Sequence, residues 1–181
     1  VYFQDKAIWN CGERYRSYQG KYPVIFVSFK DIKFDSWDLT FEMLKAVIGT
    51  EFERHFELAN SDKCSEMDKK QYRKIAEREA DIVSLSGAFD VLSRMLYRHY
   101  GQKAIIIIDE YDTPIQAAYL NHYYEEAIEF LRDMFAESFK DNDQMARAVI
   151  TGITRIAKES LFSEMNNLAV YSVMSGGPDA V

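Results

Sequence analysis

Short apolar runs alternate with longer amphipathic stretches along this chain. The run Pro-Val-Ile-Phe-Val-Ser-Phe over residues 23–29 is apolar, β-branched and aromatic, and polar residues follow it. We therefore expect a buried strand there. Apolar residues then recur at helical spacing, which predicts a helix with Ser36 as its N-cap that runs to about Leu58. These residues are Leu39, Met43, Leu44, Val47 and Ile48.

Two further stretches differ sharply in their pattern. Residues 61–78 are rich in Lys, Glu and Asp and have few apolar positions, which is typical of an exposed helix or a mobile, peripheral insertion. From Ser84 onward apolar residues again line one helical face. This pattern predicts a helix that reaches Tyr100 and stops at Gly101.

Four consecutive isoleucines, Ile105–Ile108, mark the clearest strand of the chain. A strand that is apolar and β-branched on both faces is typical of the centre of a parallel sheet with helices on both sides. After it the pattern predicts helices over 114–119 and 123–139, a strand over 146–151 and a last strand over 168–173. Strands separated by helices indicate a three-layer, mostly parallel α/β sheet.

Composition narrows the classes of function. The 181 residues carry 22 Lys and Arg against 29 Asp and Glu, a formal charge of -7, so nothing in the charge favours binding to nucleic acid. Cys11 and Cys64 stand apart from each other, which argues against a zinc site or a disulfide framework and favours a cytoplasmic location. No apolar run approaches the roughly 20 residues of a membrane span.

The isoleucine strand ends in acidic residues: Asp109, Glu110 and, two positions later, Asp112. In parallel α/β sheets, ligands sit at the carboxyl ends of the strands. A carboxylate there can hold Mg²⁺, usually through water, and the next acid can orient or deprotonate an attacking water. Four apolar residues followed by Asp-Glu form the Walker B pattern of P-loop NTPases. The alternative is a strand that ends in a polar turn whose acids cap the next helix.

The next predicted strand also ends in polar residues, Thr151 and, after a short turn, Arg155. In ATPases of this architecture a polar residue at this point senses the γ-phosphate or positions water. Arg155 could stabilise charge in the transition state, like an arginine finger. The alternatives are an ordinary strand end and a surface ion pair.

No GxxxxGK[ST] loop and no other glycine-rich turn between a strand and a helix occurs in the chain. Backbone N–H groups of such a loop grip the phosphates of a nucleotide. We therefore expect ATP binding by this chain alone to be very weak. The three histidines lie in separate, charged, helical contexts and are interpreted as packed or solvated residues. The tyrosines around 15–22 and 119–124 are interpreted as interface or core-rim residues.

Three blocks carry a resemblance to a known family. They are residues 22–33, residues 107–115 with Asp109 and Glu110, and residues 151–163 with Thr151 and Arg155. In this order they resemble the predicted AAA-ATPase-like family of bacteria, many of whose members carry a C-terminal nuclease domain of the restriction-endonuclease type. The resemblance implies a partial ATPase domain over residues 1–174, with 175–181 as a truncated tail, and a Walker A loop upstream of Val1.

The resemblance also implies roles for single residues. Asp109 and Glu110 would be the Walker B acids, and the turn from Thr151 to Arg155 would be the sensor region. We therefore expect Asp109 to bind Mg²⁺ through water and Glu110, Thr151 and Arg155 to be catalytic. From its position two residues after Glu110, Asp112 is expected to help bind the cofactor. ATP and Mg²⁺ would be cofactors of the longer parent, with a protein partner or self-association as further possibilities. The strand that leads into Walker A would be missing, so we expect a break beside 146–151 or direct pairing of 168–173 with it. The alternative function is a non-catalytic α/β protein-interaction module.

Overall fold

The computed structural model describes residues 3–140, 142–153, 161, 162, 169 and 171. Three strands form one parallel sheet in the order β1-β2-β3. They are β1 (Val24–Ser28), β2 (Ala104–Asp109) and β3 (Met145–Ile150). All three strands that fall within this part of the chain were predicted from the sequence, and the α/β class is confirmed.

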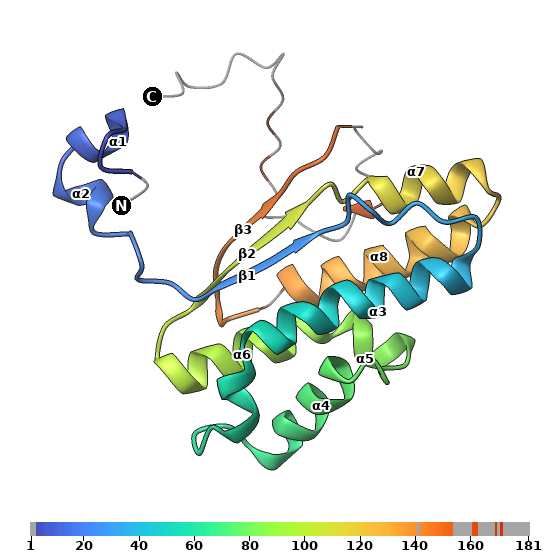
Figure 1. Cartoon of the computed structure of the whole chain (residues 1–181), viewed down its shortest axis with the longest axis horizontal. Helices are drawn as coiled ribbons and strands as arrows, with labels where there is room; N and C mark the ends of the chain where they lie inside the picture. The colour runs from blue at the N-terminus through green and yellow to red at the C-terminus, as the bar shows by residue number, and fades with distance from the viewer. Residues whose placement is uncertain (1–2, 141, 154–160, 163–168, 170, 172–181) are drawn as a thin grey trace.

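Long helices connect the strands. The segment from β1 to β2 contains α3 (Trp37–Arg54), the 3₁₀ helix η1 (Phe56–Asn60), α4 (Glu66–Ala76), α5 (Ile82–Ser86) and α6 (Ala88–Tyr100). The segment from β2 to β3 contains α7 (Thr113–Leu120) and α8 (Tyr124–Phe139). Two short helices, α1 (Ala7–Asn10) and α2 (Glu13–Arg16), precede β1 and lie away from the sheet (Figure 1).

The core lies between one face of the sheet and helices α3, α6 and α8, which pack on the same side (Figure 1). Ile25 and Val27 of β1 and Ile106 and Ile108 of β2 are almost fully buried there. From the helices the core receives Leu44, Ile48, Phe52, Leu92, Met95, Leu96, Leu131, Met134 and Phe135.

The opposite face of the sheet departs from the expected three-layer arrangement. Phe26 of β1 and Val149 of β3 are each 49% exposed, and Ile105 and Ile107 are only half-buried. The register places Phe26, Ile107 and Val149 in one row across the sheet. Within the described residues helices therefore cover one face only, because side chains of a strand alternate between faces and every second isoleucine points away from the helices.

Residues 61–78 contain helix α4, which packs against the rest of the helical layer, so they are not a peripheral insertion, which corrects one alternative from the sequence. Ser65 and Asp68 form a capping box at the start of α4, and Tyr72 and Ile75 are buried. The Asp68 carboxylate pairs with Arg94, 3.2 Å away, and with Arg98, both on α6. A buried carboxylate needs such partners, so the charged residues that suggested an exposed insertion fix α4 to α6.

Helix boundaries differ from the predictions at two points. The helix that begins after Ser36 ends at Arg54, and a 3₁₀ helix replaces its predicted last turn. The helix predicted from Ser84 is divided at Gly87 into α5 and α6. Gly101 ends α6 in the left-handed region, with φ 70, as predicted.

The outer edge of β1 is occupied by side chains of α3. The Glu51 carboxylate accepts a hydrogen bond from Phe26 N–H at 2.9 Å, and the Arg54 guanidinium donates to Val24 C=O. Arg54 Nε also donates to Glu51 at 2.8 Å. Because these groups satisfy the backbone of β1, its edge is protected against pairing with another strand.

Candidate functional site

The three strands of the sheet end in one row of polar side chains. Ser28 of β1 is the register partner of Asp109 of β2, and Thr151 directly follows Ile150, the partner of Ile108. The Thr151 hydroxyl donates to Asp109 Oδ1 at 2.5 Å, and the Ser28 hydroxyl donates to Asp109 Oδ2 at 3.2 Å. One hydroxyl from each neighbouring strand therefore holds the central carboxylate.

Backbone contacts fix this row in place. Phe29 N–H donates to Asp109 C=O at 2.9 Å, and Thr151 N–H donates to Ile108 C=O at 2.9 Å. Tyr111 N–H in turn donates to Thr151 C=O at 3.1 Å. The parallel ladder thus continues past the ends of the strands, and it sets the distance between Asp109 and Thr151.

Asp109 projects from the half-exposed face of the sheet, on the same side as Ile105 and Ile107, while Thr151 is exposed. Each oxygen of the carboxylate has two lone-pair directions, and one hydroxyl uses only one of them. The row therefore presents an anionic group with fixed orientation to a region that water can reach.

Glu110 has an unusual backbone conformation. Its φ is 52, in the left-handed region that residues with a Cβ avoid. The Thr113 hydroxyl donates to Glu110 Oε2 at 3.3 Å. Glu110 lies in the short connection between β2, which ends at Asp109, and α7, which begins at Thr113. Strained residues of this kind are frequent at functional sites.

Asp112 is 1% exposed and ties two segments together. Its Oδ2 accepts hydrogen bonds from Gln116 Nε2 at 2.8 Å and from Ile153 N–H at 3.1 Å. The sequence suggested a role in cofactor binding. That role stays a prediction, and in the structure the carboxylate also binds the backbone of the turn that follows β3.

Gly152 permits this close approach. A Cβ at position 152 would lie 2.6 Å from Asp112 Oδ1 and 2.6 Å from the Tyr111 ring, well inside van der Waals contact. No side chain larger than hydrogen fits without a shift of buried groups. A close contact of this kind leaves no local pattern in the sequence, because Tyr111 and Asp112 lie about 40 positions away.

Of the five predicted site residues, the structure brings Asp109 and Thr151 into direct contact and keeps Glu110 adjacent in the chain. Asp112 is buried and contacts the turn that follows β3. Arg155 falls outside the described residues. Ser28 was missed. Its only local signal is a hydroxyl at the last position of an apolar strand, which gains meaning once the strands are placed side by side.

Asp109 and its two hydroxyl partners are oxygen donors of the kind that Mg²⁺ prefers. Among the residues that the structure describes, no group of three or more His, Cys, Asp or Glu side chains converges as a metal site. Mg²⁺ does not require one, because it prefers hard oxygen ligands, keeps several waters and is often bound through one or two carboxylates and phosphate oxygens. One carboxylate flanked by two hydroxyls fits such a partly hydrated ion.

Comparison with known proteins identifies the family. The family described as "Predicted AAA-ATPase" matches residues 1–162, most of the chain. The chain belongs to this AAA-ATPase-like family. The match includes β1, β2 and β3 and all residues of the Ser28–Asp109–Thr151 row. The description of the family suggests an ATPase-like function.

A curated relative also matches. It is the "Uncharacterized protein in vnfD 5'region" of Azotobacter chroococcum mcd 1, which is 34% identical over 89 residues. The alignment spans 48% of this chain and 17% of that relative, so the relative is a much longer protein. No solved structure matches. No helix in the described part of this AAA-ATPase-like chain is long and apolar enough to cross a membrane.

Proposed function

We propose that the row Ser28–Asp109–Thr151, together with Glu110, is the magnesium- and water-handling half of an ATP hydrolysis site. The observation that carries this proposal is the placement of one carboxylate, held by a hydroxyl on each side, at the carboxyl edge of a parallel sheet. Ligands of open α/β sheets bind at this edge. The family assignment supports ATP as the substrate.

Asp109 and the hydroxyls have a defined role in this proposal. Asp109 holds a hydrated Mg²⁺, and when bound this ion neutralises charge that develops on the phosphate oxygens. Ser28 and Thr151 keep the carboxylate in one orientation, so that no reorganisation is needed when the nucleotide arrives. Thr151 is exposed, and in this proposal its hydroxyl also contacts the γ-phosphate.

Glu110 is the proposed group that orients or deprotonates the attacking water. Its side chain accepts a hydrogen bond from the Thr113 hydroxyl, whereas the hydroxyls of Ser28 and Thr151 hold Asp109, so the two acids have different partners in this proposal. Asp112 and Gly152 act indirectly by fixing the turn after Thr151. Arg155 belongs to the same turn region in sequence, and its proposed contact with phosphate remains part of this proposal.

The 181 residues contain no GxxxxGK[ST] loop, so we propose that the phosphate grip comes from residues outside this sequence. The two edges of the sheet differ in whether a further strand could pair with them, and this difference suggests where the missing segment would lie. Glu51 and Arg54 occupy the edge of β1, whereas β3 pairs within the described residues only with β2. We propose that the strand leading into the phosphate loop lies beside β3, and that this chain by itself is inactive.

The test uses the protein in full, as its gene encodes it. Inorganic phosphate release is measured at saturating Mg·ATP, and nucleotide binding is measured with a fluorescent ATP analogue. Glu110→Gln should retain binding and lower turnover by about 10²–10⁴-fold, the typical contribution of a general base. Asp109→Asn should weaken the Mg²⁺ dependence of both binding and turnover.

Matched controls change the same chemical groups at exposed sites away from the row. Glu79→Gln and Asp62→Asn remove exposed carboxylates of the helical layer and should leave turnover unchanged. Turnover that survives Glu110→Gln at the wild-type rate would refute the role of Glu110. Equal loss in the variants and their controls would indicate a general folding defect.

A second function is favoured by the half-exposed apolar row Phe26–Ile107–Val149. A non-catalytic interaction module would use this face to bind another protein while the acids perform no chemistry. Substitution of Phe26 by Ser distinguishes the two: it should abolish partner binding in a module, whereas Asp109→Asn should have no effect on that binding.

A further inference from the structure

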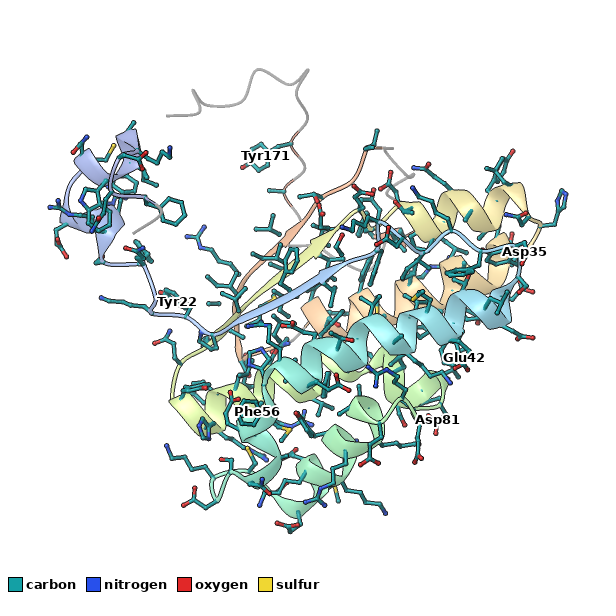
Figure 2. The ribbon with its side chains drawn as sticks, in the orientation of Figure 1. Tyr22, Asp35, Glu42, Phe56, Asp81 and Tyr171 are labelled. Atoms are coloured by element: carbon teal, nitrogen blue, oxygen red, sulfur yellow. The ribbon has the colours of Figure 1, made fainter. Side chains whose placement is uncertain are left out.

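A groove of about 350 Å³ runs between α5 and α8 in the helical layer. None of the residues that line it belongs to a strand, so it is separate from the Asp109 row. Figure 2 shows Asp81, the N-cap of α5, on the side of the helical layer that faces away from the sheet. The groove therefore lies on a different surface from the proposed ATP site.

One side and the floor of the groove are apolar. Val83 is 75% exposed and Ile82 is 47% exposed, although both belong to a helix that is packed against α8. Phe130 of α8 and Trp37 of α3 continue this surface inward, where their rings lie 5.8 Å apart. Exposed aliphatic side chains beside a concave aromatic floor are typical of a protein-binding surface.

The other side is acidic. Glu126, Glu129, Asp133 and Glu137 follow one another along the same stripe of α8, with the three- and four-residue spacing that places side chains on one helical face. The stripe covers three turns, roughly 16 Å of helix. In the described part of the chain no Lys or Arg forms an ion pair with any of these four carboxylates.

We call the side of the groove formed by Glu126, Glu129, Asp133 and Glu137 the acidic wall. The pKa of Glu137 shows that neighbouring carboxylates repel its charged form. Burial raises the pKa of its carboxyl, the nearby Asp133 and Asp90 raise it further, and the hydrogen bond from Ser86 opposes them without cancelling the rise. The Ser86 hydroxyl lies 3.3 Å from Glu137 Oε1. A cation at this point would relieve the repulsion among the carboxylates.

We propose that this groove binds a basic amphipathic helix of a partner protein. Apolar residues at i, i+3/i+4 and i+7 of that helix would cover Val83, Ile82 and the partly buried Trp37, as in other helix-in-groove complexes. Lys and Arg residues on the flanks of the apolar stripe would face the acidic wall of α8. Charge complementarity of this kind selects the partner and its orientation.

The sign of the charge argues against two other occupants. An acidic wall repels nucleic acid. A second copy of this chain would bring another formal charge of -7 to the interface. A positively charged helix matches both the apolar floor and the acidic wall.

The probe is a synthetic helical peptide with Leu along one stripe and Lys on both flanks. Trp37 lines the groove, so its fluorescence reports binding in a Trp9→Phe background that leaves it as the only tryptophan. We expect saturable binding that weakens as salt concentration rises. A peptide with Glu in place of every Lys should not bind.

Two variants of equal net charge make the test specific. Glu129→Lys with Asp133→Lys reverses the acidic wall and should weaken binding at least tenfold. Asp62→Lys with Glu77→Lys reverses two exposed acids outside the groove and should leave binding unchanged. Circular dichroism verifies that both variants fold, and Val83→Ser should lower affinity several-fold by removing apolar contact.

Equal weakening in both double variants would mean attraction by net charge alone and would overturn the proposal. Absence of binding to the wild-type chain would overturn it as well. Self-association of the wild-type chain that Glu129→Lys with Asp133→Lys abolishes would assign the groove to a second copy instead. These outcomes are independent of ATP turnover, so the failure of either proposal can be recognised separately.

Discussion

The Thr151 hydroxyl donates a hydrogen bond to Asp109 Oδ1 at 2.5 Å and thereby joins the ends of β3 and β2. Thr151→Val keeps the shape of the side chain and removes the donor. We expect a loss of about 1 kcal/mol in the free energy of unfolding, the typical net value of one hydrogen bond, measured by urea denaturation. Thr151→Ser retains the hydroxyl and should recover most of this loss. Equal stability of the Val and wild-type proteins would show that this bond contributes nothing.

Glu110 has φ 52 and should therefore respond to Gly and Ala in an unusual order. At an ordinary position Gly is less stable than Ala, because it loses more conformational entropy on folding. In the left-handed region a Cβ costs roughly 1–2 kcal/mol. We expect Glu110→Gly to be about 1 kcal/mol more stable than Glu110→Ala in chemical denaturation, with both variants inactive. The reverse order would contradict a strained backbone at Glu110.

Gly152→Ala should be strongly destabilising, because the new Cβ would lie 2.6 Å from both Asp112 Oδ1 and the buried Tyr111 ring. Overpacking of this kind typically costs about 1–3 kcal/mol. The control is Gly87→Ala, whose Cβ would meet only the end of the Glu137 side chain, at 2.9 Å, and that flexible carboxylate can move. Thermal denaturation of both variants measures the contrast, which a similar small effect at both positions would refute.

Glu51 should make the stability of the fold depend on pH. Burial by itself would raise its pKa, but hydrogen bonds from Arg54, His55 and Phe26 N–H outweigh burial and hold the pKa below the ordinary value of 4.5. The unfolded state therefore binds a proton more readily than the folded state. The stabilisation from this group is complete above pH 4.5 and is lost as the pH falls through the lower folded pKa.

Glu51→Gln tests this linkage. The variant keeps the shape of the side chain but removes its titration, so its stability should fall less steeply with acid than that of the wild type. At neutral pH it should be less stable by about 1–3 kcal/mol, because Arg54 and the β1 backbone lose a charged partner. Urea denaturation at pH 7 and below pH 4.5 measures both effects. Parallel pH profiles for the two proteins would exclude Glu51 as the group responsible.

Local patterns were sufficient for some elements and misleading for others. The Ile105–Ile108 run predicted β2 correctly because four β-branched residues leave few alternatives to a strand. Residues 61–78 were misjudged because a charged pattern does not reveal that Asp68 finds Arg94 and Arg98 on another helix. The isoleucines also suggested two covered faces, whereas Ile105 and Ile107 are half-exposed within the described residues.

The sequence by itself determined the strands, the acids at the end of β2 and the lack of a phosphate loop, because each of these is written in consecutive residues. Only the tertiary structure decided that Ser28, Asp109 and Thr151 form one row. Ser28 and Thr151 lie 81 and 42 positions from Asp109, and strand register brings them together. It also decided that Asp112 is a buried anchor and that position 152 must be Gly, because burial and close approach depend on groups distant in the chain.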